Sequence, residues 1–186
     1  MNPNDQLFLD ETENLSIRPL CADDAAALLD FYRHNSDYFA EWEPLRDESF
    51  YTLGGMQEFI ADAEREFADK KAVYFGLFGR ESGSLIGTCY FTHIVMDHFQ
   101  ACYLNFLLDE RHKGQGLMFE GAGRCIDIMF RFGLHRIMAN YCPENIRSGK
   151  LLARLGFEQE GLAHDYLYLN GRWRDHILTS RVYHPL

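Results

Sequence analysis

The chain has 186 residues, of which 47% are hydrophobic and 15% aromatic, enough for one domain with a sizeable core. Its 18 basic and 28 acidic side chains give a net charge of −10, which disfavours binding to exposed phosphate backbone, as in DNA, and favours basic partners. The five cysteines contain no C-x-x-C pair and the eight histidines show no ligand spacing, so we expect reduced thiols and no metal site. We find neither a signal peptide nor an apolar run of about 18 residues, and therefore expect a cytoplasmic protein without a membrane span.

The first part of the chain predicts one strand and two helices. Residues 15–20 alternate between apolar and polar side chains in the manner of a strand. Apolar side chains then share one helical face over residues 25–32, and again over residues 53–67. The connection between these two helices, residues 39–48, is rich in aromatic and acidic side chains.

Three strand-like runs follow the second helix. They cover residues 72–79, 85–92 and 101–108. A Glu-Ser-Gly-Ser break separates the first run from the second, and this favours an antiparallel meander.

The rest of the chain predicts a helix, a strand, a short helix and a hairpin. Gly116 opens the first of these helices, residues 136–141 form the strand, and residues 146–155 form the short helix, which a glycine closes. Residues 162–169 and 172–182 flank an Asn-Gly dipeptide, the preferred pair in two-residue hairpin turns.

This order of elements predicts a mixed α/β fold of the α+β kind. We expect a central twisted mixed sheet of about seven strands, with the antiparallel meander in its N-terminal part and about four flanking helices. A strand-helix-strand crossover would lie in the middle of the chain. We expect residues 1–11 to form an N-terminal tail and residues 12–183 to form a single domain.

The segment with the clearest chemistry is a short basic turn between a strand and a helix, Arg111 to Gly116. Backbone N–H groups in such a turn, together with the partial positive charge at a helix start, suit a phosphate, which glycine allows to approach closely. The string matches neither a Walker loop nor a dinucleotide fingerprint, whose third glycine would stand two positions before Gly121. An ordinary strand-to-helix turn is the alternative.

Two blocks of sequence together resemble the GNAT superfamily of N-acetyltransferases. Arg111-His-Lys-Gly-Gln-Gly116 resembles the pyrophosphate loop of that family, R/Q-x-x-G-x-G/A, and the stretch from Asn145 to Phe157 resembles a later block that ends in L-G-F. The similarity covers about residues 12–182. It is greatest to the RimJ/RimL group of ribosomal-protein N-acetyltransferases.

The resemblance implies where acetyl-CoA would bind. Backbone groups of Phe106, Leu107 and Leu108 would lie along its pantetheine arm, Asn145 would hydrogen-bond that arm, and Ser148 would lie near the sulfur. The pyrophosphate would be held by seven consecutive residues: Arg111, His112, Lys113, Gly114, Gln115, Gly116 and Leu117.

The acid and the base cannot be carried over from the commonest members of the family. Many of them place a tyrosine seven residues after the asparagine, where this chain has Leu152, and another branch places a glutamate base where it has Asn140. Asn140, at the position of that glutamate, and Ser148, a possible substitute for the tyrosine, are the candidate catalytic residues here. Ser148 is the candidate acid, with local capping of a helix as the alternative. Glu41, Glu43 and Asp47 are the candidate bases, of which we select Glu43, with a solvated loop carboxylate as the alternative for each.

The resemblance also implies an acceptor, the N-terminal alanine of the fifth protein of the small ribosomal subunit, whose amine would attack acetyl-CoA directly in a ternary complex. Trp42, Tyr166 and Trp173 are candidates to shape the acceptor pocket, with core packing as the alternative. Nearby carboxylates would attract a basic protein terminus: Glu41, Glu43, Asp47 and Glu48. Two other readings stay open, an acyl-CoA-binding ribosome-assembly factor with incidental or lost catalysis, and an acetyltransferase for another protein or small amine.

Overall fold

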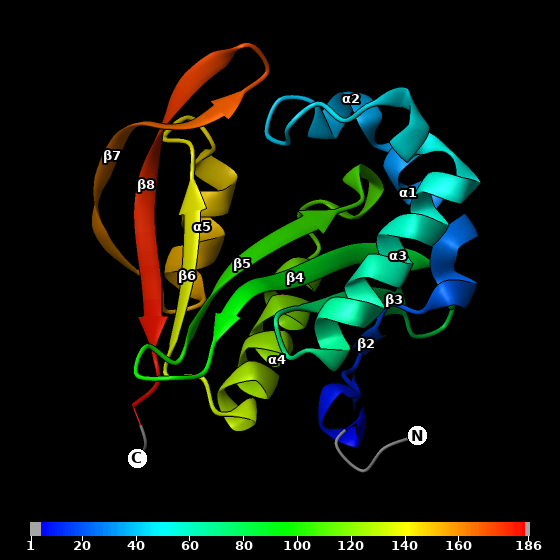
Figure 1. Cartoon of the computed structure of the whole chain (residues 1–186), viewed down its shortest axis with the longest axis horizontal. Helices are drawn as coiled ribbons and strands as arrows, with labels where there is room; N and C mark the ends of the chain where they lie inside the picture. Colours follow the sequence, from blue (N-terminus) through cyan, green and yellow to red (C-terminus); the bar gives the residue numbers. More distant parts are fainter. Residues whose placement is uncertain (1–4, 185–186) are drawn as a thin grey trace.

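One mixed sheet of eight strands runs through the protein, in the order β1-β2-β3-β4-β5-β6-β8-β7 (Figure 1). The computed structural model describes residues 5–184. The strands are β1 (Asp10–Glu11), β2 (Leu15–Pro19), β3 (Val73–Gly79), β4 (Leu85–Val95), β5 (Ala101–Leu108), β6 (Arg136–Tyr141), β7 (Glu158–Leu169) and β8 (Arg172–Val182). The α-helices in this part of the chain are α1 (Ala25–His34), α2 (Ser36–Phe39), α3 (Leu53–Ala68), α4 (Leu117–Phe132) and α5 (Ile146–Arg154).

The expected mixed fold is confirmed, with one more strand and one more helix than the pattern of the sequence indicates. Strands β3, β4 and β5 form the antiparallel meander, and β5, α4 and β6 form the parallel crossover. The additional elements are β1, of two residues, and α2, of four residues, and neither is long enough to show a period. The final hairpin turns at Asn170 and Gly171, whose φ angles of 52° and 84° are those that a tight two-residue turn requires.

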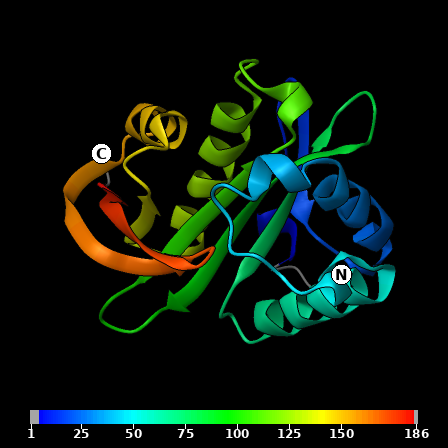
Figure 2. The same ribbon diagram turned by 90° about the horizontal axis from the view of Figure 1, so that it is seen from above.

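Two apolar clusters hold the helices against opposite faces of the sheet (Figure 2). The larger one lies under α4 and α5 and includes Cys102 and Leu104 of β5. The smaller one lies under α1 and α3, with Leu107 of β5 packed against it. Because side chains alternate along a strand, β5 serves both clusters and is the centre of the fold.

Strands β5 and β6 pair over only a short distance and then diverge. Their register consists of three Cα pairs, from Ala101 with Arg136 to Tyr103 with Met138. Beyond Tyr103, β5 continues to pair with β4 up to Leu108, while β6 continues to pair with β8. We call the region beyond these pairs the β5–β6 fork; it opens toward the end of the sheet where α2 lies (Figure 1).

The segment expected as an N-terminal tail contributes to the core. A 3-10 turn at Asp5–Phe8 places Phe8, which is 4% exposed, against the rings of Phe67 and Phe132, at centroid distances of 5.0 and 5.4 Å. Burial of this apolar ring lowers the free energy of the folded state relative to leaving it exposed to water. Residues 1–4 of the expected tail lie outside the described residues.

We searched residues 5–184 for a membrane-spanning helix and for a metal site. No helix in this range is both long and apolar enough to cross a membrane. Within the same range, no group of three or more His, Cys, Asp or Glu side chains has an arrangement that could hold a metal ion.

We expect Phe8→Ala to lower the free energy of unfolding by about 3–5 kcal/mol, as for other buried aromatic side chains. Urea denaturation checks this, with Leu9→Ala as the control. Leu9 is 43% exposed, and its replacement is expected to change stability by no more than about 0.5 kcal/mol. A change for Phe8→Ala as small as that expected for Leu9→Ala would show that the ring of Phe8 does not stabilise the domain.

Candidate functional site

The open edge of β5 forms one side of the site. Asp109 donates its N–H to the carbonyl oxygen of Ile86 in β4, at 2.9 Å. Backbone groups alternate in direction along a strand, so those of Leu107 also face β4, while those of Phe106 and Leu108 face the β5–β6 fork. The expectation of an accessible strand edge therefore fits Phe106 and Leu108. It does not fit the backbone of Leu107, which β4 engages.

The glycine loop lies directly after this edge, at the start of α4. Gly114 and Gly116 have φ angles of 77° and 80°, in the left-handed region that glycine adopts most easily. A Cβ placed on either residue would meet no atom within 4 Å, so the loop has open space beside its backbone. The first N–H groups of α4 have no partner inside the helix and are available to an anion there.

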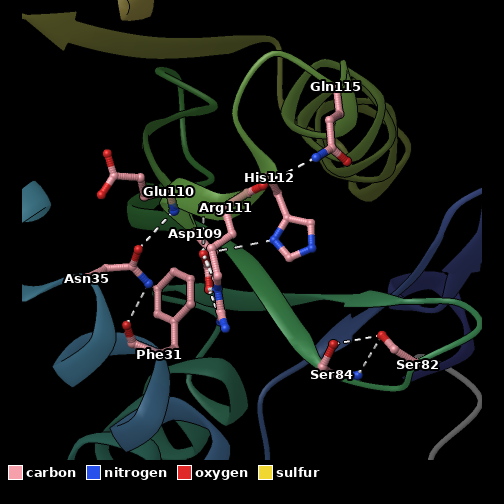
Figure 3. A network of polar contacts seen from close by, with 9 residues as sticks. All are labelled: Phe31, Asn35, Ser82, Ser84, Asp109, Glu110, Arg111, His112 and Gln115. Carbon is pink, nitrogen blue, oxygen red and sulfur yellow. Dashed lines mark hydrogen bonds and ion pairs between the residues drawn. The ribbon is translucent and has the colours of Figure 1, made fainter.

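A buried carboxylate holds the loop from beneath (Figure 3). Asp109 is 1% exposed and accepts hydrogen bonds from the backbone N–H of Arg111, at 2.9 Å, and from its guanidinium, with Nη2 at 2.6 Å. Burial by itself would raise the pKa of Asp109, but these hydrogen bonds outweigh burial and lower the pKa to about 2. Asp109 is therefore ionised at neutral pH and fixes the course of the loop.

A buried amide ties the same loop to α1. Asn35 is 1% exposed; its Oδ1 accepts the N–H of Glu110 at 2.8 Å, and its Nδ2 donates to the carbonyl oxygen of Phe31 at 2.9 Å. Figure 3 shows this chain of contacts from α1 to the loop. Because a buried amide without partners costs stability, replacement of Asn35 would affect both segments.

The basic side chains of the loop are engaged within the protein, whereas the sequence suggests that Arg111 and Lys113 supply charge to the site. Arg111 forms the ion pair with Asp109 just described, and Lys113 Nζ lies 2.5 Å from Glu110 Oε1 and 4.3 Å from the ring centre of Tyr38. These contacts reduce the charge that the two side chains offer to a ligand. Recognition of an anion by this loop then depends mainly on backbone N–H groups.

The other two side chains of the loop also turn toward the protein. Gln115 Nε2 donates to the carbonyl oxygen of Arg111 at 3.2 Å. His112 lies with Nδ1 3.9 Å from Asp109 Oδ1 (Figure 3). The hydrogen bond of Gln115 therefore supports the shape of the loop, whereas His112 Nδ1 is buried without a hydrogen-bond partner among the described residues.

Asn145 and Ser148 stand on the β6 side of the fork, at the start of α5. Asn145 is the N-cap of α5, and its Oδ1 accepts the backbone N–H of Ser148 at 3.1 Å. The amide oxygen is thus used within the helix, whereas the sequence assigned this side chain to a ligand. The side chain that caps α5 is therefore that of Asn145. Ser148 takes part in the cap only through its backbone N–H.

Asn140 and Leu152 occupy the two positions where the sequence departs from the wider GNAT family. Asn140 Nδ2 donates to the hydroxyl of Tyr166 at 3.2 Å, and its Oδ1 accepts the N–H of Thr179 at 3.4 Å. Leu152 is 1% exposed and packs in the larger cluster. Asn140 therefore bridges β7 and β8 through its amide, and Leu152 offers no polar group.

Glu43 differs from the other carboxylates of its loop because it is partly buried. Glu41, Asp47 and Glu48 are exposed. Burial raises the pKa of Glu43, and nearby Arg46 opposes part of this effect. A carboxylate with a raised pKa is a better proton acceptor, so the structure distinguishes Glu43 from its neighbours.

Two buried tyrosines of the smaller cluster lie close enough to Glu43 to feel its charge, and no local pattern in the sequence predicts their pairing. The hydroxyls of Tyr32, from α1, and Tyr90, from β4, are 3.5 Å apart. Burial raises the pKa of Tyr32 to about 12, and the negative charge of Glu43 acts in the same direction. Tyr32 and Tyr90 therefore stay protonated and can donate hydrogen bonds.

The three aromatic candidates for an acceptor pocket are distributed over two elements and a loop. Trp42 lies 5.9 Å from the guanidinium of Arg174, and Tyr166 contacts Asn140 and is partly buried. Trp173 is 58% exposed and stacks edge-to-face with Tyr168 at the end of the hairpin. Core packing therefore does not account for Trp173.

Known proteins are similar to this chain in sequence and in fold. The profile of the acetyltransferase (GNAT) domain matches residues 14–158. A ribosomal protein uS5-alanine N-acetyltransferase of Escherichia coli strain K12 is 44% identical over 170 residues, which are 91% of this chain and 88% of that protein. The structure of a ribosomal-protein-S5-alanine acetyltransferase from Vibrio fischeri has a TM-score of 0.90 at 36% identity, covering 94% of this chain and 96% of that one. A probable N-acetyltransferase, YjcK of Bacillus subtilis strain 168, is 31% identical over 90% of this chain and 93% of that protein.

We expect Asp109→Asn to lower the free energy of unfolding at pH 7 by about 1–3 kcal/mol, because Arg111 loses its buried charged partner. The folded-state pKa of Asp109, about 2, is below its ordinary value of 3.8. The stabilisation is therefore complete above pH of about 4 and is lost as the pH falls toward about 2. Urea denaturation at pH 7 and at pH of about 2.5 measures this difference. The control is Glu81→Gln, at an exposed carboxylate in the β3–β4 turn; a difference between wild type and Asp109→Asn that does not shrink at the lower pH would contradict the assignment.

Proposed function

The chain belongs to the GNAT family of acetyltransferases, and we propose that it transfers the acetyl group of acetyl-CoA to the N-terminal alanine of ribosomal protein uS5. One structural observation carries the enzymatic part of this proposal. The open edge of β5 leads directly into a two-glycine loop at the start of a 16-residue helix. The choice of acceptor rests on the Escherichia coli and Vibrio fischeri relatives.

The residues of the fork and the loop fit acetyl-CoA. Peptide groups of Phe106 and Leu108 would pair with the amides of the pantetheine arm, as a neighbouring strand would. The loop from Arg111 to Leu117 would receive the pyrophosphate, in the space that a Cβ on Gly114 or Gly116 would enter. When bound, acetyl-CoA supplies the activated acyl group. The Nδ2 group of Asn145 would be the part of that side chain left for a hydrogen bond to the arm.

The protein would contribute modest acid-base assistance. An α-amine has a pKa of roughly 7.7–8.0, so part of it is already neutral at cytoplasmic pH. Glu43 would accept the proton of the attacking amine, directly or through water. The hydroxyls of Tyr32 and Tyr90 would orient the Glu43 carboxylate. Ser148 would donate a hydrogen bond to the departing thiolate. Asn140 would keep Tyr166 in place beside the acceptor.

The acceptor would be drawn in by charge. Ribosomal proteins are rich in Lys and Arg, and Glu41, Asp47 and Glu48 are exposed on the loop that carries Glu43. Opposite charges of this kind accelerate encounter and are screened over about 8 Å at physiological ionic strength. The partner would be the basic N-terminus of uS5 in the cytoplasm, either free or on the small subunit.

The function is tested by incubating the protein with acetyl-CoA and a basic peptide that starts with alanine. We expect mass spectrometry to show one added acetyl group and the release of one equivalent of free thiol. The control peptide has the same lysines and a blocked N-terminus, and we expect no transfer to it. Transfer to the blocked peptide would indicate a lysine acetyltransferase. Binding of acetyl-CoA without transfer to either peptide would support the assembly-factor alternative.

A glycine substitution tests the binding of acetyl-CoA. Asparagine tolerates the left-handed conformation, so Gly116→Asn places a side chain in the phosphate space with little backbone strain, whereas Gly116→Val would be strained. We expect its affinity for acetyl-CoA, measured by calorimetry, to fall at least about tenfold, or about 1.4 kcal/mol. The matched control is Gly83→Asn, at a left-handed turn with φ of 67° and open surroundings. Equal affinities of the two variants would rule out this loop as the phosphate site.

A further inference from the structure

The turn of the β7–β8 hairpin contacts the loop that carries Glu43. In both views the tip of the hairpin meets this loop at the open end of the β5–β6 fork (Figures 1 and 2). Asn170 Nδ2 donates to the carbonyl oxygens of Ala40, at 2.5 Å, and Glu43, at 3.3 Å. Its Oδ1 accepts the N–H of Leu45 at 3.1 Å. One side chain thus serves three backbone groups, each at least 125 residues away in sequence.

The turn by itself does not require these contacts. Asn170 has a φ of 52°, and either asparagine or glycine satisfies such a position. Asparagine adds an amide with both donors and an acceptor, and here all of its contacts go to the loop. The side chain therefore has a role beyond the conformation of the hairpin.

The loop depends on this side chain for its position. The backbone N–H of Glu43 donates to Phe39 at 2.9 Å, and the next local backbone bond in the described chain joins Phe50 to Asp47. Between these two points, the hydrogen bonds described for the backbone come from Asn170. Without it, the backbone of the segment that holds the partly buried carboxyl of Glu43 would keep its described hydrogen bonds at the ends only.

The same contact connects the two parts of the divided sheet. At one end of the fork, β5 and β6 are joined by three Cα pairs. At the other end, Asn170 joins the β7–β8 hairpin to the loop after α2, and the guanidinium of Arg174 lies 5.9 Å from the ring of Trp42. The contact therefore spans the side of the site from which we expect the acceptor to enter.

We propose that Asn170 is a positioning residue, whose amide holds the backbone of the loop that carries Glu43 in place at the acceptor side of the fork. This inference rests on the proposed function, since it assigns Glu43 to the reacting amine. Asn170 touches neither substrate. It acts through the loop, so its loss affects the use of the acceptor and leaves the acetyl-CoA loop, at the start of α4, unchanged.

Two substitutions break the contact, one wholly and one in part, and keep the turn. Asn170→Gly removes all three hydrogen bonds, and Asn170→Asp replaces the donating amide with a carboxylate that faces two carbonyl oxygens. The matched control is Gly171→Asn, because it alters the adjacent turn position, with φ of 84° and open space around a Cβ, and leaves the contact intact. Asparagine tolerates such an angle.

We expect hydrogen exchange to detect the contact without any assay of activity. In Asn170→Gly, the segment of residues 40–47, and the amide of Leu45 in particular, exchanges faster than in wild type. The segment exchanges at the wild-type rate in Gly171→Asn. Unchanged exchange in Asn170→Gly would overturn the proposal, because the loop would then be held by other contacts.

Kinetics with the alanine-starting peptide test whether the contact positions Glu43. We expect Asn170→Gly and Asn170→Asp to lower kcat about tenfold or more, while the Kd for acetyl-CoA stays within about twofold of wild type. The acid limb of kcat/KM moves to lower pH in Asn170→Gly, because a more solvated Glu43 loses the effect of burial that raises its pKa. Faster exchange combined with wild-type kcat and an unshifted acid limb would overturn the positioning role. If wild type transfers no acetyl group, the proposed function fails, and the exchange experiment alone decides whether Asn170 holds the loop.

Discussion

The early divergence of β5 and β6 is the constraint on which the rest of the structure depends. A strand in the middle of a sheet normally forms hydrogen bonds along both of its edges. Backbone groups along an unpaired edge remain able to bind another strand or a ligand. Here β5 leaves the peptide groups of Phe106 and Leu108 without a neighbouring strand on one side. The chain turns directly from this edge into the loop at the start of α4, so the open strand edge and the glycine loop form one continuous path.

The loop on this path is shaped by charges that the protein uses internally. Asp109 and Asn35 hold it from beneath, and the charges of Arg111 and Lys113 are largely committed to Asp109 and Glu110. Arg111 and Lys113 therefore offer less positive charge to a ligand, but the backbone N–H groups of the loop are held in fixed positions. A preorganised set of N–H groups needs no rearrangement when an anion binds. Under the proposed function, such a loop would let an acidic protein hold the phosphates of a coenzyme.

Local patterns in the sequence were sufficient for most of the fold and for the family. Apolar periodicity depends on near neighbours in the chain, and it indicated seven of the strands and the four longest helices. The glycine loop and the Asn-Gly turn require particular backbone angles of particular residues, so they too could be recognised from short strings. The resemblance to the GNAT family rested on two such strings, and the comparisons confirm it.

Only the tertiary structure decided which side chains act together, because these contacts join residues that are distant in sequence. Asn35 and Glu110 are 75 residues apart, and Asn170 and Glu43 are 127 residues apart, and no local pattern marks either pair. The sequence by itself determined that Glu43 is one of several loop carboxylates, whereas the fold decided that it is the partly buried one. Burial and pairing depend on how whole helices and strands pack against one another. They can therefore be determined only from the folded structure.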